Sequence, residues 1–328
     1  MTISQAHKNG MPNSAVISIT EKCNSRCSFC NIWRTGNLGD MDPALIDKLP
    51  DSLKNVDITG GEPFLHSRLS AIIEKLARRK CNVIINTNGL VNLEKYSVLW
   101  KIKKMGIRFS LDAVGQKHDD LRGVVGCYEK VLKNIEYLKS IKLNNIGISS
   151  TFLDSNISYM TDLYAMSKRL GINFTCMVAG NSDVFYKKND NIIKNPEAFK
   201  CNIGAVIKSE LFGGAISGWR KLIYMTELIK FIDGEIDKIC CPAGNKFFFM
   251  LPNGDIYACN MRNLLMGNLT KECFEDIWYS ARAKEIRMLA DNCSQPCWTM
   301  CNAKSVVSNA KLKYLGRFLK NINKIMAF

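Results

Sequence analysis

The sequence has few histidines and no long apolar run, and both absences narrow the classes of protein it can encode. No uninterrupted stretch of eighteen apolar residues occurs, so we expect no membrane-spanning helix. The first residues, MTISQAHKNGMPNS, lack the apolar segment of a secretory signal, so we expect a cytoplasmic protein. With only three histidines, at scattered positions, zinc sites of mixed cysteine and histidine are disfavoured.

Cysteine, in contrast, is abundant. The 328 residues include 14 cysteines, and disulfide-rich scaffolds are usually much shorter and exported. Metal or redox chemistry is therefore the favoured use of these thiols. The formal net charge of +15 adds nucleic acid and anionic membrane to the partners to consider.

Short β-rich runs alternate with segments of helical periodicity. We expect strands at 14–20, 55–59, 82–86, 107–111, 146–152 and 172–178, and helices that include 67–79 and 128–140. Such alternation is typical of right-handed βαβ units around a parallel sheet. Six units are too few for a closed eight-stranded barrel, so the predicted fold is α/β, a partial (β/α)6 TIM-like barrel. A doubly wound sheet is the alternative.

The unusual residues of the first half follow these strands directly. Cys23, Cys27 and Cys30 follow the first strand, GGEP at 60–63 the second, TNG at 87–89 the third, and Asp112 the fourth. Barrels and open α/β sheets bind ligands at the carboxyl ends of their strands. We therefore expect these loops to surround one cavity.

The first cysteine group has the spacing C-x3-C-x2-C. A cubane cluster of four irons normally takes four thiolates, so three would leave one iron open to a ligand. The alternatives are three buried cysteines or part of a zinc site. The polar surroundings, EKCNSRCSFCN, disfavour the first alternative, and the second lacks a nearby fourth ligand.

This motif, followed in order by the other strand-end motifs, resembles the signature of the radical S-adenosylmethionine (radical SAM) superfamily over about 14–185. The resemblance implies a [4Fe–4S] cluster on Cys23, Cys27 and Cys30 whose open iron binds SAM. It also implies reductive cleavage of SAM to a 5′-deoxyadenosyl radical that removes a substrate hydrogen, with Phe29 near the adenine.

The same resemblance assigns further SAM contacts. Gly60, Gly61, Glu62 and Pro63 match the motif that meets the SAM amino group, and a carboxylate suits an ammonium. Asn86 and Asn88 occupy the position that contacts the ribose or carboxylate. Ser110 and Asp112 match a nucleoside-binding motif, and Arg122 matches an arginine that pairs with the SAM carboxylate. A solvated side chain is the alternative for Asn88, Ser110, Asp112 and Arg122.

A second cysteine group begins within a predicted β-hairpin at 240–260, which follows a predicted helical stretch at 195–233. Its C-x12-G-x4-C pattern resembles the SPASM/twitch auxiliary-cluster domain, which implies one auxiliary [4Fe–4S] cluster. The favoured ligands are Cys241, Cys259, Cys297 and Cys301, with Cys293 as an alternative ligand. A four-thiolate zinc site is the rival interpretation. Cys81, Cys127, Cys176, Cys201 and Cys273 are expected to be buried thiols.

The expected organisation has five parts. These are an N-terminal tail (1–13), the radical SAM core (14–200), a helical linker (201–236), a small cysteine-rich hairpin and helix domain (237–302) and a basic amphipathic helix (303–328). The last could lie on an anionic membrane, such as the inner face of the cell membrane, or dock on the protein itself.

The predicted function is that of a radical SAM oxidoreductase. Its substrate would be a saccharide- or lipid-linked small molecule or a peptide, bound near Asn181 and Asp183, and its electron donor a flavodoxin or ferredoxin. An enzyme that modifies RNA and a zinc-binding adaptor with a basic tail are the alternatives, and nucleic acid is the less favoured partner.

Overall fold

The computed structural model describes residues 10–212, 219–235, 241–293, 297–301, 303 and 316. The expected basic helix at 303–328 thus lies outside the described residues, apart from Ala303 and Gly316. None of the described helices has both the length and the apolar character needed to cross a membrane.

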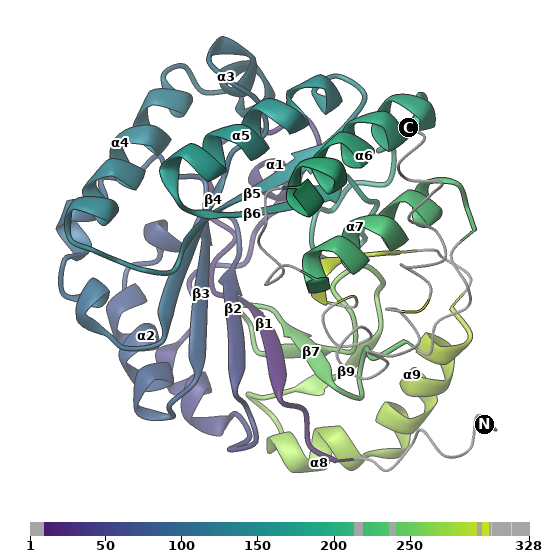
Figure 1. The fold of residues 1–328 in the computed structure, drawn as a ribbon. Helices are drawn as coiled ribbons and strands as arrows, with labels where there is room; N and C mark the ends of the chain where they lie inside the picture. The colour runs from purple at the N-terminus through teal and green to yellow at the C-terminus, as the bar shows by residue number, and fades with distance from the viewer. Residues whose placement is uncertain are drawn as a thin grey trace.

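Six parallel strands form the core of the molecule, as predicted (Figure 1). They lie side by side in chain order, joined by parallel pairing at each step. Their bounds are β1 (Ser14–Ser18), β2 (Asn55–Thr59), β3 (Asn82–Thr87), β4 (Met105–Ser110), β5 (Ile146–Phe152) and β6 (Asn173–Val178). The observed bounds lie within about two residues of the predicted runs.

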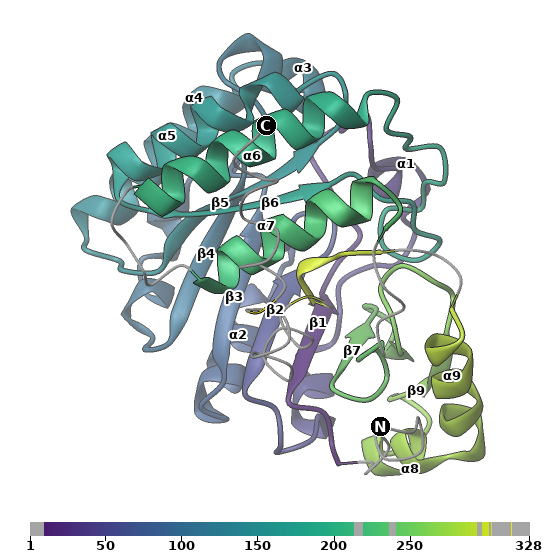
Figure 2. The same cartoon turned by 45° about the vertical axis from the view of Figure 1, so that its right-hand side comes forward.

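Helices cover the outer face of this sheet and complete the βα units (Figure 2). They are α2 (Leu69–Arg78), α3 (Gln116–Arg122), α4 (Cys127–Ser140), α5 (Met160–Leu170) and α6 (Pro196–Phe212). Two further helices, α1 (Ile32–Thr35) and α7 (Trp219–Ile232), lie on the inner side, where Trp33 and Tyr224 line a cavity. The predicted apolar stripe of α2 is buried, because Leu69, Ile72, Ile73 and Leu76 lie at helical spacing and face the sheet core.

The inner face of the sheet is unusually polar. Parallel strands buried on both faces are normally near-continuous apolar runs. Here the outward positions are apolar, such as Ile85 and Ile107, but the inward ones carry side chains that line a cavity. They are Asn55, Asp57, Asn86, Arg108, Ser110, Ser149, Thr151, Asn173 and Thr175. Val16, Ile84 and Met177 face the same cavity, so the lumen of the partial barrel offers both polar and apolar side chains to a ligand, and the main apolar core lies between sheet and helices.

The predicted C-terminal hairpin is present, but it continues the barrel sheet. β7 (Phe247–Met250) pairs in parallel with β1, and β8 (Asp255–Tyr257) and β9 (Leu265–Asn268) follow in antiparallel order. The result is one nine-stranded sheet in the order β6-β5-β4-β3-β2-β1-β7-β8-β9. α8 (Phe274–Tyr279) and α9 (Ala281–Asp291) complete this part of the chain.

The helix α7 links β6 to the second cysteine segment. Tyr224 of α7 donates its hydroxyl to the Cys176 carbonyl at 2.9 Å, and its own carbonyl accepts from Trp298 Nε1 at 2.9 Å. The Tyr224 and Trp298 rings also stack, with centroids 6.1 Å apart. The two cysteine-bearing parts of the chain are therefore joined both through β1 with β7 and through α7.

We expect Phe248→Ala in β7 to lower the free energy of unfolding of the metal-free protein by about 3–5 kcal/mol. Phe248 is fully buried beside Phe274 and Trp278, and its strand is part of the common sheet. Urea unfolding followed by circular dichroism and tryptophan fluorescence would measure this. Phe212→Ala is the control, because Phe212 is 76% exposed. A separate early transition of β7–β9 would contradict a common sheet.

Candidate functional site

One cavity of about 830 Å³ joins most of the residues predicted for the site. Its walls include the three cysteines of the first group, the loops after β2, β3 and β4, and Cys301 of the second group. The predicted site residues that line it are Cys23, Cys27, Phe29, Cys30, Gly60, Gly61, Asn86, Asn88, Ser110, Arg122 and Cys301. The strand ends thus converge on a single cavity.

The three cysteines of the first group are chemically suited to an iron–sulfur cluster. Burial raises the pKa of Cys23 to about 12 and that of Cys30 to about 11, and the neighbouring thiols add to this. Deprotonation therefore needs a strongly positive partner, which a bound metal supplies. Within the described ranges, no three cysteine, histidine or acidic side chains converge on one point as a single ion requires. A cubane instead takes one thiolate per iron, so three separate sulfurs around one cavity fit it.

The paired glycines after β2 bring this loop against the cysteine loop. The amide of Gly61 donates to the Thr20 carbonyl at 2.7 Å, and the amide of Glu62 donates to the Lys22 carbonyl at 2.7 Å. A Cβ atom on Gly61 would lie 2.2 Å from the Lys22 oxygen. Glycine is therefore required at position 61 by the close approach of the backbone of the cysteine loop.

Glu62 does not line the cavity. Its carboxylate is fully buried and accepts three hydrogen bonds, from the Phe64 amide at 3.0 Å, the Thr87 hydroxyl at 2.8 Å and the Asn88 amide at 2.7 Å. Burial raises the pKa of Glu62 to about 7, although each of these donors lowers it. Pro63 is buried beside it, at the start of a short 3-10 turn, Pro63–Leu65.

The loop after β3 holds the cysteine loop from the other side. The Asn88 side-chain amide donates to Asn24 Oδ1 at 2.7 Å and to Ser25 Oγ at 3.0 Å. Asn86 donates to the Ile58 carbonyl of the neighbouring strand, and Ser110 faces the cavity from the end of β4. Asn88 therefore positions the segment between Cys23 and Cys27.

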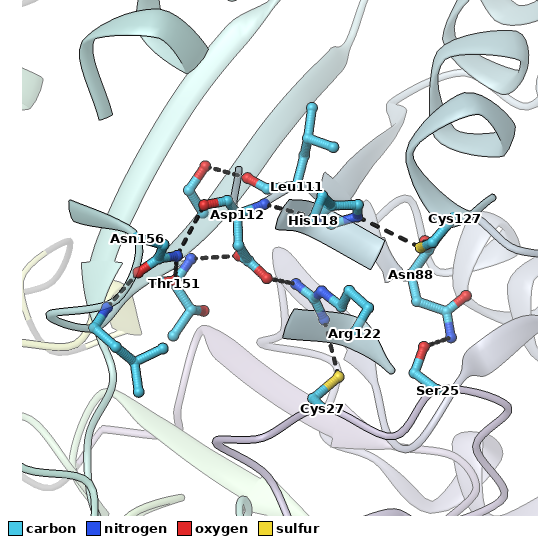
Figure 3. Close-up of polar contacts among 12 residues, drawn as sticks. Ser25, Cys27, Asn88, Leu111, Asp112, His118, Arg122, Cys127, Thr151 and Asn156 are labelled. Carbon is cyan, nitrogen blue, oxygen red and sulfur yellow. Dashed lines mark hydrogen bonds and ion pairs between the residues drawn. The ribbon is translucent and has the colours of Figure 1, made fainter. Parts of the chain in front are cut away.

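Asp112 and Arg122 form a buried ion pair beside the first cysteine group (Figure 3). Arg122 Nη2 lies 2.5 Å from Asp112 Oδ2, and Nη1 donates to the Cys27 sulfur at 3.5 Å. The guanidinium also lies 5.3 Å from the centre of the Phe29 ring. Arg122 Nε is buried and has no hydrogen-bond partner among the described residues, and the Arg122 side chain lines the cavity. Asp112 itself does not line the cavity.

Several supporting residues were missed by the sequence analysis. The Thr151 amide donates to Asp112 Oδ1 at 2.8 Å, and Asn156 donates to the Asp112 carbonyl at 2.8 Å. His118 Nδ1 accepts from the Asp112 amide at 3.1 Å, and its Nε2 lies 3.4 Å from the Cys127 sulfur (Figure 3). Burial lowers the pKa of His118 to about 3, so the ring is neutral. The sequence feature that could have pointed to His118 is its position in the chain between Asp112 and Arg122.

The second cysteine group is also brought together. Cys241, Cys259 and Cys301 pack on one apolar cluster with Phe247 and Met261. Burial raises the pKa of Cys241 to about 12, with further contributions from Cys297, Cys259 and Cys293. Burial raises the pKa of Cys259 as well, and Cys293 contributes to that shift. Cys293 and Cys297 therefore lie near Cys241, and Cys301 both packs in the cluster of Cys241 and Cys259 and faces the large cavity.

The predicted substrate residues Asn181 and Asp183 do not line the cavity, whereas Cys176 does. Asn181 accepts from the Asn191 amide, and Asp183 is exposed and accepts from Asn189. Cys81, Cys127 and Cys176 are buried as expected, but the expectation was wrong for Cys201 and Cys273, which are exposed. Cys201 lies in α6 and Cys273 directly precedes α8, and the local sequence did not show that either side chain faces solvent.

Asn260 is a cavity residue that the sequence analysis missed. It follows Cys259, is 8% exposed, and its Oδ1 has no hydrogen-bond partner among the described residues. Its carbonyl is held by Ser182 Oγ at 2.7 Å. A buried side-chain amide that faces a cavity is suited to bind a polar ligand.

Comparison with known proteins identifies two domains. Residues 17–165 match the Radical SAM superfamily, and residues 240–302 match the iron–sulfur cluster-binding domain named SPASM. The AdoMet-dependent heme synthase of Oleidesulfovibrio alaskensis is 26% identical over 184 residues, which are 52% of this chain and 47% of that protein. The antilisterial bacteriocin subtilosin biosynthesis protein AlbA of Bacillus subtilis is 23% identical over 292 residues, 85% of this chain. The chain spans 62% of AlbA's length.

Solved structures share the fold. The crystal structure of Streptococcus suis SuiB bound to S-adenosylmethionine superposes with a TM-score of 0.64 at 17% identity, covering 84% of this chain and 68% of that one. SuiB bound to its precursor peptide SuiA gives a TM-score of 0.64 at 18% identity, covering 84% of this chain and 67% of that one.

We expect Glu62→Gln to lower the free energy of unfolding of the metal-free protein by about 1–3 kcal/mol. The new amide would turn a donor toward the Asn88 amide or the Phe64 amide and leave it unpaired. Urea unfolding would measure the change. Glu94→Gln is the matched control, because Glu94 is exposed. Equal stability of the two variants would show that the Glu62 carboxylate does not hold these loops.

Proposed function

Because the chain combines a radical SAM domain with a SPASM cluster-binding domain, we propose that it is a radical SAM enzyme that modifies a peptide. When bound, the first cluster and SAM supply a 5′-deoxyadenosyl radical that removes a hydrogen atom from the substrate. Cys23, Cys27 and Cys30 would hold this cluster. The observation that carries the proposal is the single cavity that these cysteines share with the second cysteine segment.

The chain's own residues have distinct tasks in this proposal. The loops after β2 and β3 fix the cysteine loop through Glu62 and Asn88. Phe29, Asn86, Ser110 and Arg122 line the same cavity as the first cysteine group and are proposed to bind SAM. Gly60 and Gly61 pack closely against the backbone of residues 20–22, and these contacts fix the shape of the cavity beside the cysteine loop.

The substrate would lie in the rest of the cavity, between the first cysteine group and Asn260. A buried Asn amide is a good partner for a peptide unit, because its oxygen accepts and its nitrogen donates. The names of two relatives support the same class, since one takes part in bacteriocin biosynthesis and the other binds a precursor peptide. The lipid- or saccharide-linked alternative depended on the basic segment 303–328, which lies outside the described residues.

The auxiliary cluster would supply a site that accepts an electron from the substrate radical or anchors the substrate. We propose Cys241, Cys259, Cys293 and Cys297 as its ligands, which replaces Cys301 of the sequence-based set by Cys293. The couplings of Cys293 with both Cys241 and Cys259 support this choice. A flavodoxin or ferredoxin is the proposed source of the electron that starts the reaction.

We expect anaerobic reconstitution to give about eight irons per chain, as two [4Fe–4S] clusters require. A variant with Cys23, Cys27 and Cys30 changed to alanine should retain about four. Iron analysis would count them, and chromatography would detect 5′-deoxyadenosine, which only the parent should form with reductant and SAM. Loss of all iron in the variant would leave the second group to zinc or to no metal. A parent without iron or SAM cleavage would refute the proposed function.

We expect Cys293→Ala to reduce the iron content from about eight to about four per chain, because the auxiliary site would lose one of the four thiolates proposed to hold its cluster. Cys301→Ala should retain about eight, and this makes it the matched control. Iron analysis of both reconstituted proteins tests the assignment. The reverse result would restore Cys301 as the fourth ligand of the auxiliary cluster.

A further inference from the structure

Arg122 is a buried cation that donates a hydrogen bond to a sulfur of the first cysteine group. It ends α3, is 6% exposed, and is fixed at both the backbone and the guanidinium. Its carbonyl accepts from the Arg26 amide within the cysteine loop at 2.7 Å. Its Nη1 donates to the Cys27 sulfur at 3.5 Å, a distance within the range of hydrogen bonds to sulfur. Cys27 is itself buried, so water screens this contact little.

We propose that Arg122 raises the reduction potential of the cluster on Cys23, Cys27 and Cys30 through this hydrogen bond, and that Asp112 limits the effect. This inference rests on the proposed function, because it assumes that these cysteines hold a cluster. It assigns Arg122 a task that does not depend on SAM, in addition to the SAM contact that the sequence implied.

The physical basis is the charge of the reduced cluster. Reduction adds one electron, so a positive hydrogen-bond donor at a ligand sulfur stabilises the reduced form more than the oxidised form. Arg122 lies against the Asp112 carboxylate, which favours its charged form. Arginine also cannot lose its proton in proteins, so the effect does not vanish with pH.

Asp112 sets how much of this charge reaches the sulfur. Its carboxylate is fully buried, and it is fixed by the Thr151 amide at Oδ1 and by the ion pair at Oδ2. The opposite charges are 2.5 Å apart, so they largely cancel at long range. Arg122 is nearer to Cys27, which leaves a net positive field at the sulfur. Removing the charge of Asp112 alone should therefore raise the reduction potential, and removing both charges of the pair should lower it.

Two variants test this reasoning. Asp112→Asn leaves Arg122 without its counter-charge and should raise the potential. The double variant Arg122→Met with Asp112→Leu removes the whole pair, leaves no buried charge unpaired, and should lower it. We expect each shift to change the ratio of reduced to oxidised cluster at a fixed potential about tenfold, which is about 59 mV for one electron. Arg34→Met is the control and should not shift the potential, because Arg34 is exposed.

The measurement is an anaerobic potentiometric titration of the reconstituted full chain without SAM, followed by electron paramagnetic resonance. The same titration of the variant lacking Cys23, Cys27 and Cys30 gives the auxiliary signal for subtraction. Because SAM is absent, a role of Arg122 in SAM binding alone would leave the potential unchanged. Opposite shifts of the two variants at full iron content support the inference.

Unchanged potentials at full iron content would overturn the inference and leave the proposed function intact. Shifts of both variants in the same direction would also overturn it, because the ion pair would then not control the field at Cys27. A parent chain that takes up no iron at the first group would overturn the proposed function, and this inference with it.

Discussion

The buried carboxylate of Glu62 is the point on which the arrangement of the site depends. Its own amide holds the backbone before Cys23, and its side chain fixes the amides of Phe64 and Asn88. Asn88 in turn binds Asn24 and Ser25 within the cysteine loop. Loops after three different strands are thereby locked together, although no strand pairing connects them at this edge. A cluster-binding loop needs this support, because three thiols in eight positions cannot define their own geometry.

The polar lumen is the second constraint. A parallel sheet gains stability by burying apolar side chains on both faces, and this sheet does so only on the outer one. The inward Asn, Ser, Thr and Arg side chains remain beside a cavity of about 830 Å³. Pairing of β7 with β1 closes part of the cavity wall, and α7 closes another part. The fold therefore gives up part of the apolar core inside the barrel and gains a cavity, lined by polar and apolar side chains, between two groups of cysteines.

Much of the strand and helix pattern, and the position of the first cysteine group, could be predicted from local sequence. The β1–β6 runs are β-rich over five to seven residues, and α2 and α4 carry regular apolar stripes, so local pattern and tertiary packing agree. The cysteine spacing also identified the first group correctly as part of a strand-end cavity. These features depend on residues close together in the chain, which is why a pattern can reveal them.

What could not be predicted depends on distant contacts. The parallel register of Ser14 with Phe247 joins segments that no local pattern connects. Glu62 had the residue type of a ligand contact, and only the positions of Phe64, Thr87 and Asn88 show that its oxygens are already used. His118 was discounted as one of three scattered histidines, yet it supports Asp112. In each case the deciding partner comes from another loop or strand.

The two fully buried carboxylates beside the cavity are stabilised in different ways, and the difference matters for the chemistry. Glu62 has only uncharged donors within hydrogen-bond distance, and burial brings its pKa to about 7. Asp112 has a cation, and that cation reaches the Cys27 sulfur. A buried ion pair is a weak source of stability, since two apolar side chains of similar size would often serve as well. The pair is therefore better explained by what it does at the sulfur: it fixes a positive donor beside a cluster ligand without leaving a net charge buried in the core.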